Sequence, residues 1–559
     1  MSDVSADTID VAARVNARPE LALFTVKRDI ETQDDTKLAA LEIEGLTGIA
    51  PVALRESGAS SDVARAAIEI AGDANRVFAA QVGADQITQL RARIAMSDQI
   101  LVQSTLGFEA FATAQTALEL STSKRDVIVS PGSRVSRTKN SYLTHGFHKY
   151  KAKFFPRMAR ALTNHVCPSG TVGDPYMGSG TLGVEARLMG LSAVGIDIDP
   201  LSVMISNLKA TALSLPADVL GEAIAQVSMQ LKGGLLFDFA DTPPSLPGQS
   251  ELPHFIGRKA SDMDREPIEL ETARIRGAIA TVPGGAGRDL LLLGLSHALA
   301  TKVSLRWMGT GDPRFSLSIA KRPLGNIFFA HLDLMHRRLQ DRDSLRDAKF
   351  ISPTLGNSST ELGDARALPW QDSSIDGIVT SPPYLPASSG RETYLRSRAP
   401  SLVALGLLTE EQLLLREGSL VGSIDRSAPS DSVGLPPSVR ELVEWMLPQR
   451  ARRPKALPTA AYFLDIAASL REMGRTLKPG GKAAVVLSYQ HVFYDALTRQ
   501  HVRTVVMPDI VDQLIADPEN RIDLTVRAVH KLQLPKMDYA ARPASTGDYA
   551  EAVIVLQRN

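Results

Sequence analysis

The spacing of hydrophobic residues divides the chain near residue 120. Before that point the sequence is rich in Ala, Leu, Glu and Arg, and apolar residues recur at helical intervals, as at Ile87, Leu90, Ile94 and Leu101. This pattern predicts a helical N-terminal region over residues 1–125. Because no catalytic pattern occurs in it, we expect a scaffolding or dimerisation role. The polar stretch from Ser121 to Ser141 contains Pro131 and Gly132 and predicts a linker.

A different rhythm begins at residue 171, where a strand, a glycine-rich turn, a helix and a second strand follow one another. The apolar runs 171–173 and 193–196 predict strands, and residues 182–189 and 201–213 predict helices. A strand, a helix and a second strand in quick succession form the start of a βαβ unit. The sequence therefore predicts an α/β fold with a parallel sheet.

The α/β rhythm breaks after residue 214 and resumes near residue 350. A structureless loop of that length is improbable, so residues 215–350 are interpreted as an inserted, mainly helical subdomain, with a buried helix from Leu290 to Val303. The flanking parts, 126–214 and 351–559, then belong to one domain. Within the second part the pattern predicts a helix at 462–477 and strands at 375–380, 483–487, 523–529 and 550–556.

Composition changes this picture little. At 559 residues the chain exceeds what one hydrophobic core usually supports, and 44% hydrophobic with 22% charged residues is typical of a globular protein. The single cysteine, Cys167, excludes an internal disulfide framework and a multi-cysteine zinc site, and we predict no metal centre. The N-terminus lacks a signal pattern, and no apolar stretch approaches the ~18 residues of a membrane span. We expect a cytoplasmic protein without a membrane partner.

The glycine-rich turn lies where open α/β sheets bind ligands, between the first strand and its helix. Gly178, Gly180 and Gly183 spell G-x-G-x-x-G, and Asp197 follows at the end of the second strand, as in a dinucleotide fingerprint. A pyrophosphate, however, would lie close to the Asp174 carboxylate, which is unfavourable. S-adenosylmethionine has no phosphate and carries an ammonium and a sulfonium, so it suits this turn better. NAD or FAD binding and a purely structural turn are the alternatives.

Asp197 is placed to accept hydrogen bonds from both ribose hydroxyls of such a cofactor, and Asp199 is a less suitable substitute.

The segment Ile378 to Tyr384 combines an apolar strand end with a serine, two prolines and an aromatic residue. The exocyclic amine of a base is a poor nucleophile because its lone pair is delocalised into the ring. The Ser381 hydroxyl and the Pro382 carbonyl are candidate acceptors for its N–H groups, and the prolines hold the loop rigid without adding donors. Tyr384 can stack on a base flipped out of the duplex. The alternative is a Pro-Pro turn closing a strand with a core tyrosine.

Both segments resemble those of the amino-group DNA methyltransferases, which modify cytosine N4 or adenine N6. Asp174 to Thr181 is similar to their D-P-F-x-G-S-G-T motif with Tyr176 in place of Phe, and Ser381 to Tyr384 to their (S/D/N)-P-P-(Y/F/W) motif. The segment His148 to Pro156 resembles the block that encloses the methionine end of the cofactor. The resemblance implies cofactor contacts from Asp174, Pro175, Tyr176, Gly178, Ser179, Gly180, Thr181, Asp197, Asp364, Lys153 and Phe154, and a catalytic role for Ser381, Pro382, Pro383 and Tyr384.

The family implies a Rossmann-like class I methyltransferase sheet, mostly parallel with one antiparallel strand, and S-adenosylmethionine as cofactor. Serine before Pro-Pro-Tyr is the form usual in N4-cytosine enzymes, so we expect cytosine N4, with adenine N6 as the alternative. An RNA amino-methyltransferase and a silent nucleic-acid-binding module are alternatives from other classes. Methylation of cytosine C5 needs a thiol nucleophile, and Cys167 is better interpreted as a small buried hydrophobe.

Double-stranded DNA is the expected partner, with any cognate restriction enzyme a separate protein. Lys+Arg and Asp+Glu both total 62, so only local charge is informative. Either the insertion or residues 385–460 could read the target sequence. Basic clusters that could neutralise phosphates are Lys124, Arg125, Arg134, Arg137, Lys139, Lys149, Lys151, Lys153, Arg157 and Arg160, then Arg391, Arg396 and Arg398, and finally Arg450, Arg452, Arg453 and Lys455.

Overall fold

The computed structural model describes most of the chain. The described residues are 19–27, 35–105, 107–121, 141–150, 153–233, 252–254, 256, 262–307, 315–352, 354–385, 394–423, 425–426, 434–494, 498, 500–533 and 550–559. Among these residues, no helix combines the length and the apolar character that crossing a membrane requires.

The N-terminal domain is built on an antiparallel sheet with strand order β2-β3-β1-β4-β5. Its strands are β1 (Glu20–Val26), β2 (Val52–Ala53), β3 (Val77–Val82), β4 (Ser97–Ser104) and β5 (Gly107–Ala112). Its helices are α1 (Asp35–Thr47), α2 (Ser61–Ala71), α3 (Ala84–Arg93) and α4 (Ala114–Leu120).

The expectation of a purely helical N-terminal region is therefore wrong. Ile87 and Leu90 do share a buried face of α3, but that helix ends at Arg93, and Leu101 lies in β4. Strands covered on both faces show no alternation of apolar and polar residues, as in β1, whose last five residues are all buried and, apart from Thr25, apolar. Such runs lack the alternation that marks a half-exposed strand, so they resemble helix segments in the sequence.

The second sheet has seven strands in the order β10-β7-β6-β11-β12-β16-β15. All neighbours from β10 to β12 are parallel, whereas β16 runs antiparallel to both β12 and β15. The predicted mostly parallel sheet with one antiparallel strand is confirmed. The strands are β6 (Thr171–Asp174), β7 (Ser192–Asp197), β10 (Ser358–Leu362), β11 (Ile375–Thr380), β12 (Leu477–Ser488), β15 (Thr525–Gln533) and β16 (Ala550–Gln557).

Side chains of the central strands alternate between two hydrophobic cores. Ile378 packs into the core formed with α16 (Arg453–Thr476) and α17 (Met507–Ala516), and its neighbour Val379 packs into the opposite core with α5 (Pro156–Val166) and α6 (Thr181–Leu188). This is the period-two alternation of a strand covered on both faces. Helix α7 (Pro200–Ala212) follows β7 and contacts β10 at the edge of the sheet.

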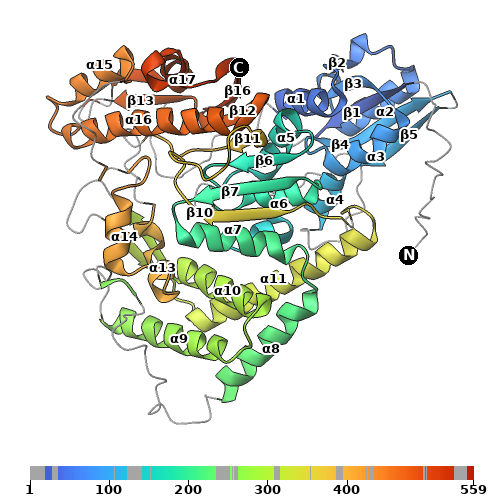
Figure 1. The fold of residues 1–559 in the computed structure, drawn as a ribbon. Helices are drawn as coiled ribbons and strands as arrows, with labels where there is room; N and C mark the ends of the chain where they lie inside the picture. Colours follow the sequence, from blue (N-terminus) through green and yellow to red (C-terminus); the bar gives the residue numbers. More distant parts are fainter. Residues whose placement is uncertain are drawn as a thin grey trace.

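The N-terminal domain packs on α5 through a buried polar cluster (Figure 1). Glu42 of α1 accepts hydrogen bonds from the Ala95 and Met96 amides at 2.7 and 3.0 Å and from the Asn164 side chain of α5 at 2.7 Å. Burial raises the pKa of Glu42 to about 7 despite these bonds. The cluster holds the first sheet against the second, so the N-terminal domain is a fixed part of the molecule.

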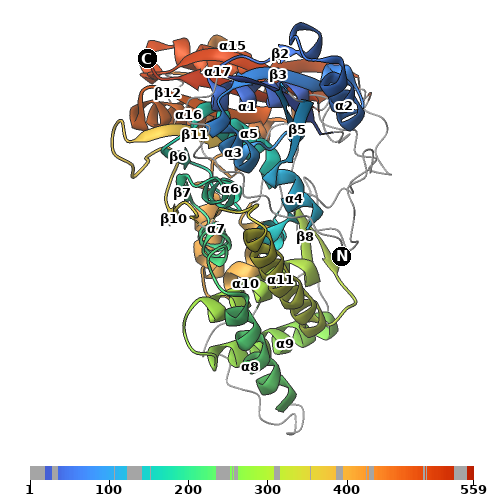
Figure 2. The ribbon, with the colours of Figure 1, turned by 90° about the vertical axis from the view of Figure 1, so that its right-hand side faces the viewer.

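The described residues between 215 and 350 form the helical layer below α7 in Figures 1 and 2. The layer is mainly helical, as predicted, and one antiparallel hairpin is added to it. Leu290, Leu291, Leu293 and Leu295 are all fully buried, so α10 is enclosed on several sides, as the sequence indicates. The elements are α8 (Ala217–Gly233), α9 (Asp262–Ala280), α10 (Ala286–Lys302), β8 (Val303–Trp307), β9 (Phe315–Ile319) and α11 (Leu324–Asp347).

The stretch after β11 divides between two places. Helices α13 (Ala399–Ala404) and α14 (Glu410–Glu417) join the core of the insertion, whereas α15 (Pro437–Met446) packs on α16. A hairpin of β13 (Gln490–Tyr494) and β14 (His501–Val506) lies beside α15, with the Trp445 and Phe493 rings 5.6 Å apart. In Figure 1 these two groups lie below and above the left-hand edge of the sheet.

Candidate active site

The glycine-rich segment from Asp174 to Thr181 is called the cofactor turn below, and the segment from Ser381 to Tyr384 is called the catalytic loop, after their predicted roles. They leave adjacent parallel strands at the same edge of the sheet. Strands β6 and β11 are hydrogen-bonded neighbours, with Val172 opposite Gly377 and Gly173 opposite Ile378. At their carboxyl ends the Thr380 hydroxyl donates to Asp174 Oδ1 at 2.6 Å. The two predicted site segments therefore meet, and a buried side-chain hydrogen bond links them.

The glycine-rich turn follows a path that only glycine accommodates at two positions. Gly178 and Gly180 both adopt the left-handed conformation, with φ of +52° and +73°. A Cβ on Gly180 would lie 2.6 Å from the Ser206 Cα of α7, and one on Gly178 would lie 3.3 Å from the Tyr150 hydroxyl. Because these glycines have no side chains, a ligand could approach the backbone of the turn closely. The turn lies at the carboxyl end of β6, where α6 begins, which is where open α/β sheets bind ligands.

Two carboxylates shape this turn from the ends of their strands. Asp174 Oδ1 accepts the Tyr176 amide at 3.0 Å, and Asp197 Oδ2 accepts the Gly178 amide at 2.8 Å. Burial raises the pKa of Asp174 to about 7. Burial and the neighbouring Asp199 raise the pKa of Asp197 to about 6. Both acids are thus held in an environment that a nearby positive charge would stabilise.

From the sequence, Asp199 was a less suitable substitute for Asp197 as the acceptor of the ribose hydroxyls, and in the structure its carboxylate has other partners. It accepts the Leu201 amide at 2.9 Å and so caps α7, and it pairs with the partly buried Arg398. The Arg398 guanidinium lies 4.0 Å from the centre of the Tyr150 ring. Arg398 therefore ties the stretch that follows the catalytic loop to the acidic end of β7.

The segment before α5 lies against the turn, as the resemblance implies. The Tyr150 hydroxyl bonds to Ser202 at 2.8 Å, and the Phe154 carbonyl accepts the Thr181 hydroxyl at 3.3 Å. Lys153 donates to the His145 carbonyl at 3.1 Å, and burial lowers the pKa of this lysine to about 8. Phe154 is thus brought to the cofactor turn through its backbone.

Asp364 lies two residues after the end of β10. The preceding residue, Gly363, donates its amide to the Asp197 carbonyl at 3.0 Å, so Asp364 lies close to the end of β7. Its carboxylate is paired with Arg366 at 2.5 Å. Burial would raise the pKa of Asp364, but the hydrogen bonds and charge of Arg366 outweigh that effect and lower it. Asp364 therefore carries a negative charge beside the carboxyl end of β7.

An open cavity of about 500 Å³ lies beside these strand ends. Arg416 of α14 donates to the Ile198 carbonyl at 3.1 Å, next to Asp197, and the Ser419 carbonyl accepts from Arg366 at 3.0 Å. These contacts join two of the lining residues to segments that neighbour Asp197 and Asp364, although neither carboxylate is among the residues that line the cavity. The lining residues are Leu407, Leu408, Gln412, Leu415, Arg416 and Ser419.

The catalytic loop is held by two residues from other elements. The buried Tyr462 of α16 donates to the Pro383 carbonyl at 3.0 Å, and the Tyr384 hydroxyl donates to Glu551 Oε1 of β16 at 2.8 Å. Burial, followed by the charge of Glu551, raises the pKa of Tyr384 well above its usual value. Ser381 remains partly exposed at the strand end, whereas Pro382 is buried.

Comparison with known proteins gives the family. Residues 115–207 match the family model of the N6/N4 methyltransferases, described as DNA methylase. The chain is 37% identical over 372 residues to the Type II methyltransferase M.MvaI of Kocuria varians, a match that covers 61% of this chain and 76% of that protein. The chain belongs to this family. A second match, 40% identical over 78 residues, covers 14% of this chain and 14% of the Type II methyltransferase M.MjaII of Methanocaldococcus jannaschii.

Solved structures give weaker matches to this methyltransferase. A SAM-dependent methyltransferase of Methanosarcina mazei aligns over 71% of this chain and 96% of its own, with 10% identity and a TM-score of 0.24. The rRNA methyltransferase aviRa of Streptomyces viridochromogenes aligns over 76% of this chain and 94% of its own, with 10% identity and a TM-score of 0.27. The fold assignment therefore rests on the strand order and directions described above.

The cofactor of the methyltransferase is S-adenosylmethionine, and the site fits it. The turn offers two glycines in the left-handed conformation, of which Gly180 leaves no room for a Cβ, and the carboxylates of Asp174 and Asp197 favour a cation, such as a sulfonium or ammonium, over a phosphate. Lys209, a buried lysine that contacts the turn, donates to the Ser179 carbonyl at 2.6 Å, and burial lowers its pKa well below the usual value. It adds little positive charge to oppose such a ligand.

Two members of the proposed phosphate-binding clusters are internal, so that interpretation is wrong for them, and two others are partly buried and engaged in ion pairs. Arg157 and Arg160 are buried and pair with Glu119 and Glu185 at 2.8 and 2.5 Å. Arg398 pairs with Asp199, and Arg396 pairs with Asp425 at 2.6 Å. Cys167 is buried in the core beside α5, as expected. Outside the described residues lie Lys124, Arg125, Arg134, Arg137, Lys139, Lys151 and Arg391.

Proposed function

We propose that this methyltransferase transfers a methyl group to N4 of a cytosine flipped out of double-stranded DNA, in a sequence-specific modification role. The observation that carries the proposal is the Thr380–Asp174 hydrogen bond at 2.6 Å, because it joins the cofactor turn to the loop that would hold the base. Serine rather than aspartate at position 381 favours cytosine over adenine within the family that the chain belongs to.

The loop supports this reaction through its hydrogen-bond acceptors. In a bound complex S-adenosylmethionine supplies an electrophilic methyl group. The Ser381 Oγ and the Pro382 carbonyl would accept the two N–H groups of the amine, which favours a pyramidal, more nucleophilic nitrogen. Tyr462 fixes the next carbonyl, that of Pro383, so the loop is held rigid before the base arrives. The Tyr384 ring would stack on the base.

The cofactor's adenosine end would occupy the cavity beside Asp197 and Asp364. Asp197 would accept the ribose hydroxyls, and Asp364 would accept the adenine amine. Helix α14, which contributes residues to the cavity lining, belongs to the part of the chain that follows the catalytic loop. The loop that would hold the base and the helix that would cover the cofactor therefore come from the same part of the sequence.

The nature of the methylated base is tested by expressing the protein in cells without amino-methylated DNA and analysing the nucleosides by mass spectrometry. We expect N4-methylcytosine, and none from a Ser381→Ala variant. N6-methyladenine would contradict the cytosine assignment but retain the reaction class. If neither nucleoside appears in DNA and tRNA is methylated instead, the DNA assignment fails. Sequencing the methylated positions gives the recognised word.

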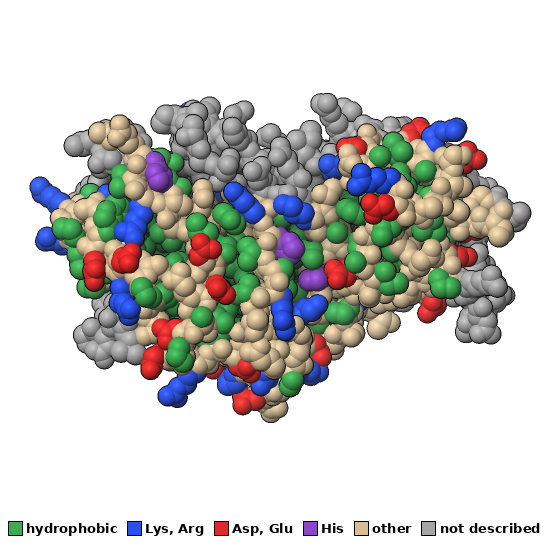
Figure 3. Space-filling view, turned by 90° about the horizontal axis from the view of Figure 1, so that it is seen from above, with side chains coloured by type: hydrophobic (Ala, Val, Ile, Leu, Met, Phe, Trp, Pro, Cys, Tyr) green, Lys and Arg blue, Asp and Glu red, His purple; other side chains and the backbone are tan. Residues whose placement is uncertain are grey.

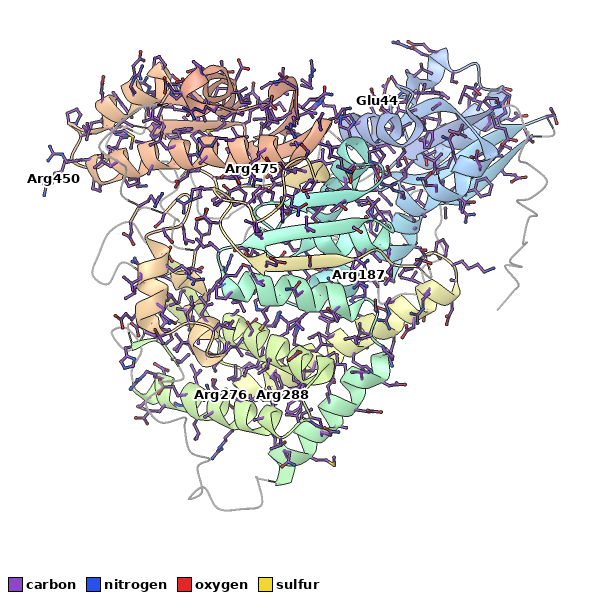
Figure 4. The ribbon with its side chains drawn as sticks, in the orientation of Figure 1. Glu44, Arg187, Arg276, Arg288, Arg450 and Arg475 are labelled. Carbon is purple, nitrogen blue, oxygen red and sulfur yellow. The ribbon has the colours of Figure 1, made fainter. Side chains whose placement is uncertain are left out.

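The carboxyl ends of the strands face the end of the molecule where α16 begins. In Figure 4, Arg187 near the end of α6 is labelled at the right-hand part of the sheet, and β7 begins four residues after α6 ends. Strand β7 therefore runs from right to left, toward the side where Arg450 is labelled. Seen from above, Lys and Arg side chains stand at the left-hand end, with acidic ones beside them (Figure 3). Arg452 lies 4.8 Å and Arg503 lies 5.8 Å from the centre of the Trp445 ring.

We propose that Arg450 and Arg453, both exposed beside this stack, contact DNA phosphates. In an Arg450→Ala/Arg453→Ala double variant, DNA affinity should fall alike for all sequences. The slope of log affinity against log salt concentration should become less steep by about 2, because each phosphate contact contributes about 0.9. Fluorescence anisotropy at several salt concentrations measures both quantities. The matched control is Arg55→Ala/Arg65→Ala on the exposed surface of the N-terminal domain, and an equal effect there would contradict the proposal.

A further inference from the structure

Two carboxylates lie close together at the carboxyl end of β7, and only one of them is open to a ligand. Asp199 is buried, whereas Asp197 is partly exposed. Among the described contacts, each oxygen of Asp197 accepts one backbone amide, from Gly178 at 2.8 Å and from Asp199 at 2.9 Å. A carboxylate oxygen can accept two hydrogen bonds, so Asp197 has one further acceptor site on each oxygen. These two sites match the two hydroxyls of a ribose.

Both oxygens of Asp199 are engaged, one of them by an arginine from a distant part of the chain. Oδ1 accepts the Leu201 amide at 2.9 Å, and Oδ2 accepts the Ser202 hydroxyl at 3.1 Å. Oδ2 also accepts the guanidinium of Arg398, which follows the catalytic loop in the sequence. A buried carboxylate that lacks such a partner is strongly unfavourable, because its charge is left uncompensated. Arg398 therefore decides how much negative charge lies beside Asp197.

Arg398 is held in this place by the segment that precedes α5. Its guanidinium lies 4.0 Å from the centre of the Tyr150 ring and donates to the Ser202 hydroxyl at 3.1 Å, and that hydroxyl is bonded to the Tyr150 hydroxyl at 2.8 Å. The same tyrosine lies against the cofactor turn, since a Cβ on Gly178 would be 3.6 Å from two of its ring carbons. Arg398 therefore contacts both Asp199 and a side chain that lies against the cofactor turn.

We propose that Arg398 is a positioning residue that neutralises Asp199 and thereby keeps Asp197 ionised and able to accept the ribose of the cofactor. Arg398 acts on the cofactor through these two acids and not by contact. The inference rests on the proposed placement of the ribose at Asp197. It deepens that proposal, because it explains how one of two adjacent acids is reserved for the ligand.

The charges around Asp197 agree with this role. Burial and then the charge of Asp199 raise the pKa of Asp197, to about 6, and the charge of Arg398 opposes them. Without Arg398, Asp197 would take up a proton at a higher pH, and a protonated carboxyl has fewer acceptor sites. Burial raises the pKa of the Tyr150 phenol, so this neighbour stays uncharged. Titratable groups on the neighbouring elements, which the variants below leave in place, are Asp174, Asp364, Arg366 and Arg416.

The test measures S-adenosylmethionine binding to the whole chain by calorimetry at pH 7, with thermal melting to follow the fold. Arg398→Met removes the charge and leaves an unbranched side chain that can still pack on Tyr150. We expect the dissociation constant to rise about tenfold, because a nearby opposite charge changes the protonation equilibrium of a carboxylate by about 10- to 1,000-fold.

The matched control is Arg342→Met, at the opposite end of α7 from Asp199. Arg342 of α11 is also buried, pairs with Asp343 at 2.6 Å and donates to the Ala212 carbonyl at 2.8 Å. Its loss should lower the melting temperature and leave the cofactor affinity at the parental value.

A second substitution separates an effect of charge from an effect of packing. In Arg398→Met/Asp199→Asn the uncompensated carboxylate is gone, and the asparagine oxygen can still accept the Leu201 amide and cap α7. Most of the lost cofactor affinity should therefore return. If Arg398 only supported the packing of its neighbours, the second substitution would restore nothing.

The pH dependence of binding gives an independent measurement. As the pH drops, the affinity of Arg398→Met should begin to fall at a higher pH than that of the parent, because Asp197 is protonated earlier. The two proteins should therefore differ most near neutral pH and least at alkaline pH. A loss of packing would change the dissociation constant by the same factor at every pH.

The inference is overturned if Arg398→Met binds the cofactor like the parent at every pH, or if its loss is independent of pH and is not relieved by Asp199→Asn. Should Arg398→Met not fold, the double variant decides the matter, because it should bind nearly as tightly as the parent, and a folded double variant that binds tenfold more weakly or worse would refute the role. A ribose held elsewhere is detected separately, since Asp197→Ala would then keep the parental affinity.

Discussion

Replacing Ser381 by alanine is expected to lower kcat about 100-fold while the dissociation constant for S-adenosylmethionine stays within about twofold of the parent. The magnitude is that of removing one preorganised polar group aimed at developing charge, about 100- to 1,000-fold. Cofactor affinity should be retained because Ser381 follows β11, whereas the glycine-rich turn follows β6. Single-turnover kinetics gives the rate of methyl transfer, and calorimetry gives the cofactor affinity.

Ser374→Ala is the matched control, because Ser374 lies just before β11 at the other end of the same strand and its hydroxyl bonds only to the Gln371 carbonyl among the contacts described. It should keep the parental kcat. If Ser381→Ala turns over normally, the amine is not held by this hydroxyl. If both kcat and cofactor affinity collapse, Ser381 instead supports the fold of the cofactor turn.

The central part of the fold could be predicted because its sequence patterns are local. Strand β6, the turn, helix α6 and strand β7 lie within 27 consecutive residues, from Thr171 to Asp197, and each has its expected apolar run. One antiparallel strand in the sheet was implied by the family resemblance and not by the spacing of residues, and its identity as β16, paired with β12 and β15, comes from the structure. The N-terminal sheet was missed because its buried strands show no alternation and its helices dominate the composition.

The site residues supplied by distant segments could not be predicted. Glu551 lies 167 positions after Tyr384, and Arg398 lies 199 positions after Asp199. Nothing in the local sequence of β16 distinguishes a glutamate that faces a catalytic loop from one that faces water. Arg398 did carry a signal, as part of a basic run, but the run was interpreted as surface charge. Pairing with a buried acid requires knowledge of which strand ends meet.

The cofactor side of the site makes the second large prediction, which concerns Asp197. In Asp197→Ala the dissociation constant for S-adenosylmethionine should rise about 100-fold. Two hydrogen bonds from ribose hydroxyls to a carboxylate contribute about 1.5 kcal/mol each at the lower end of the usual range, and about 3 kcal/mol corresponds to about 100-fold. Isothermal titration calorimetry measures the change directly.

The same carboxylate also anchors the turn, since it accepts the Gly178 and Asp199 amides at 2.8 and 2.9 Å. Asp376→Ala is the control for losing a carboxylate that accepts a backbone amide. Asp376 accepts the Thr171 amide at 2.8 Å at the opposite end of the sheet, so its removal should lower thermal stability without changing cofactor affinity.

Acid provides an independent check on Asp197, because its pKa is raised to about 6 in the free protein. A positively charged ligand favours the ionised form, so binding lowers this pKa and affinity should fall as the pH drops from 7 through 6. Asp174, whose pKa is about 7, contributes in the same direction. Asp197→Ala should therefore retain only the part of the pH dependence that is centred near 7. A variant that binds the cofactor as tightly as the parent at every pH would show that the ribose is held elsewhere.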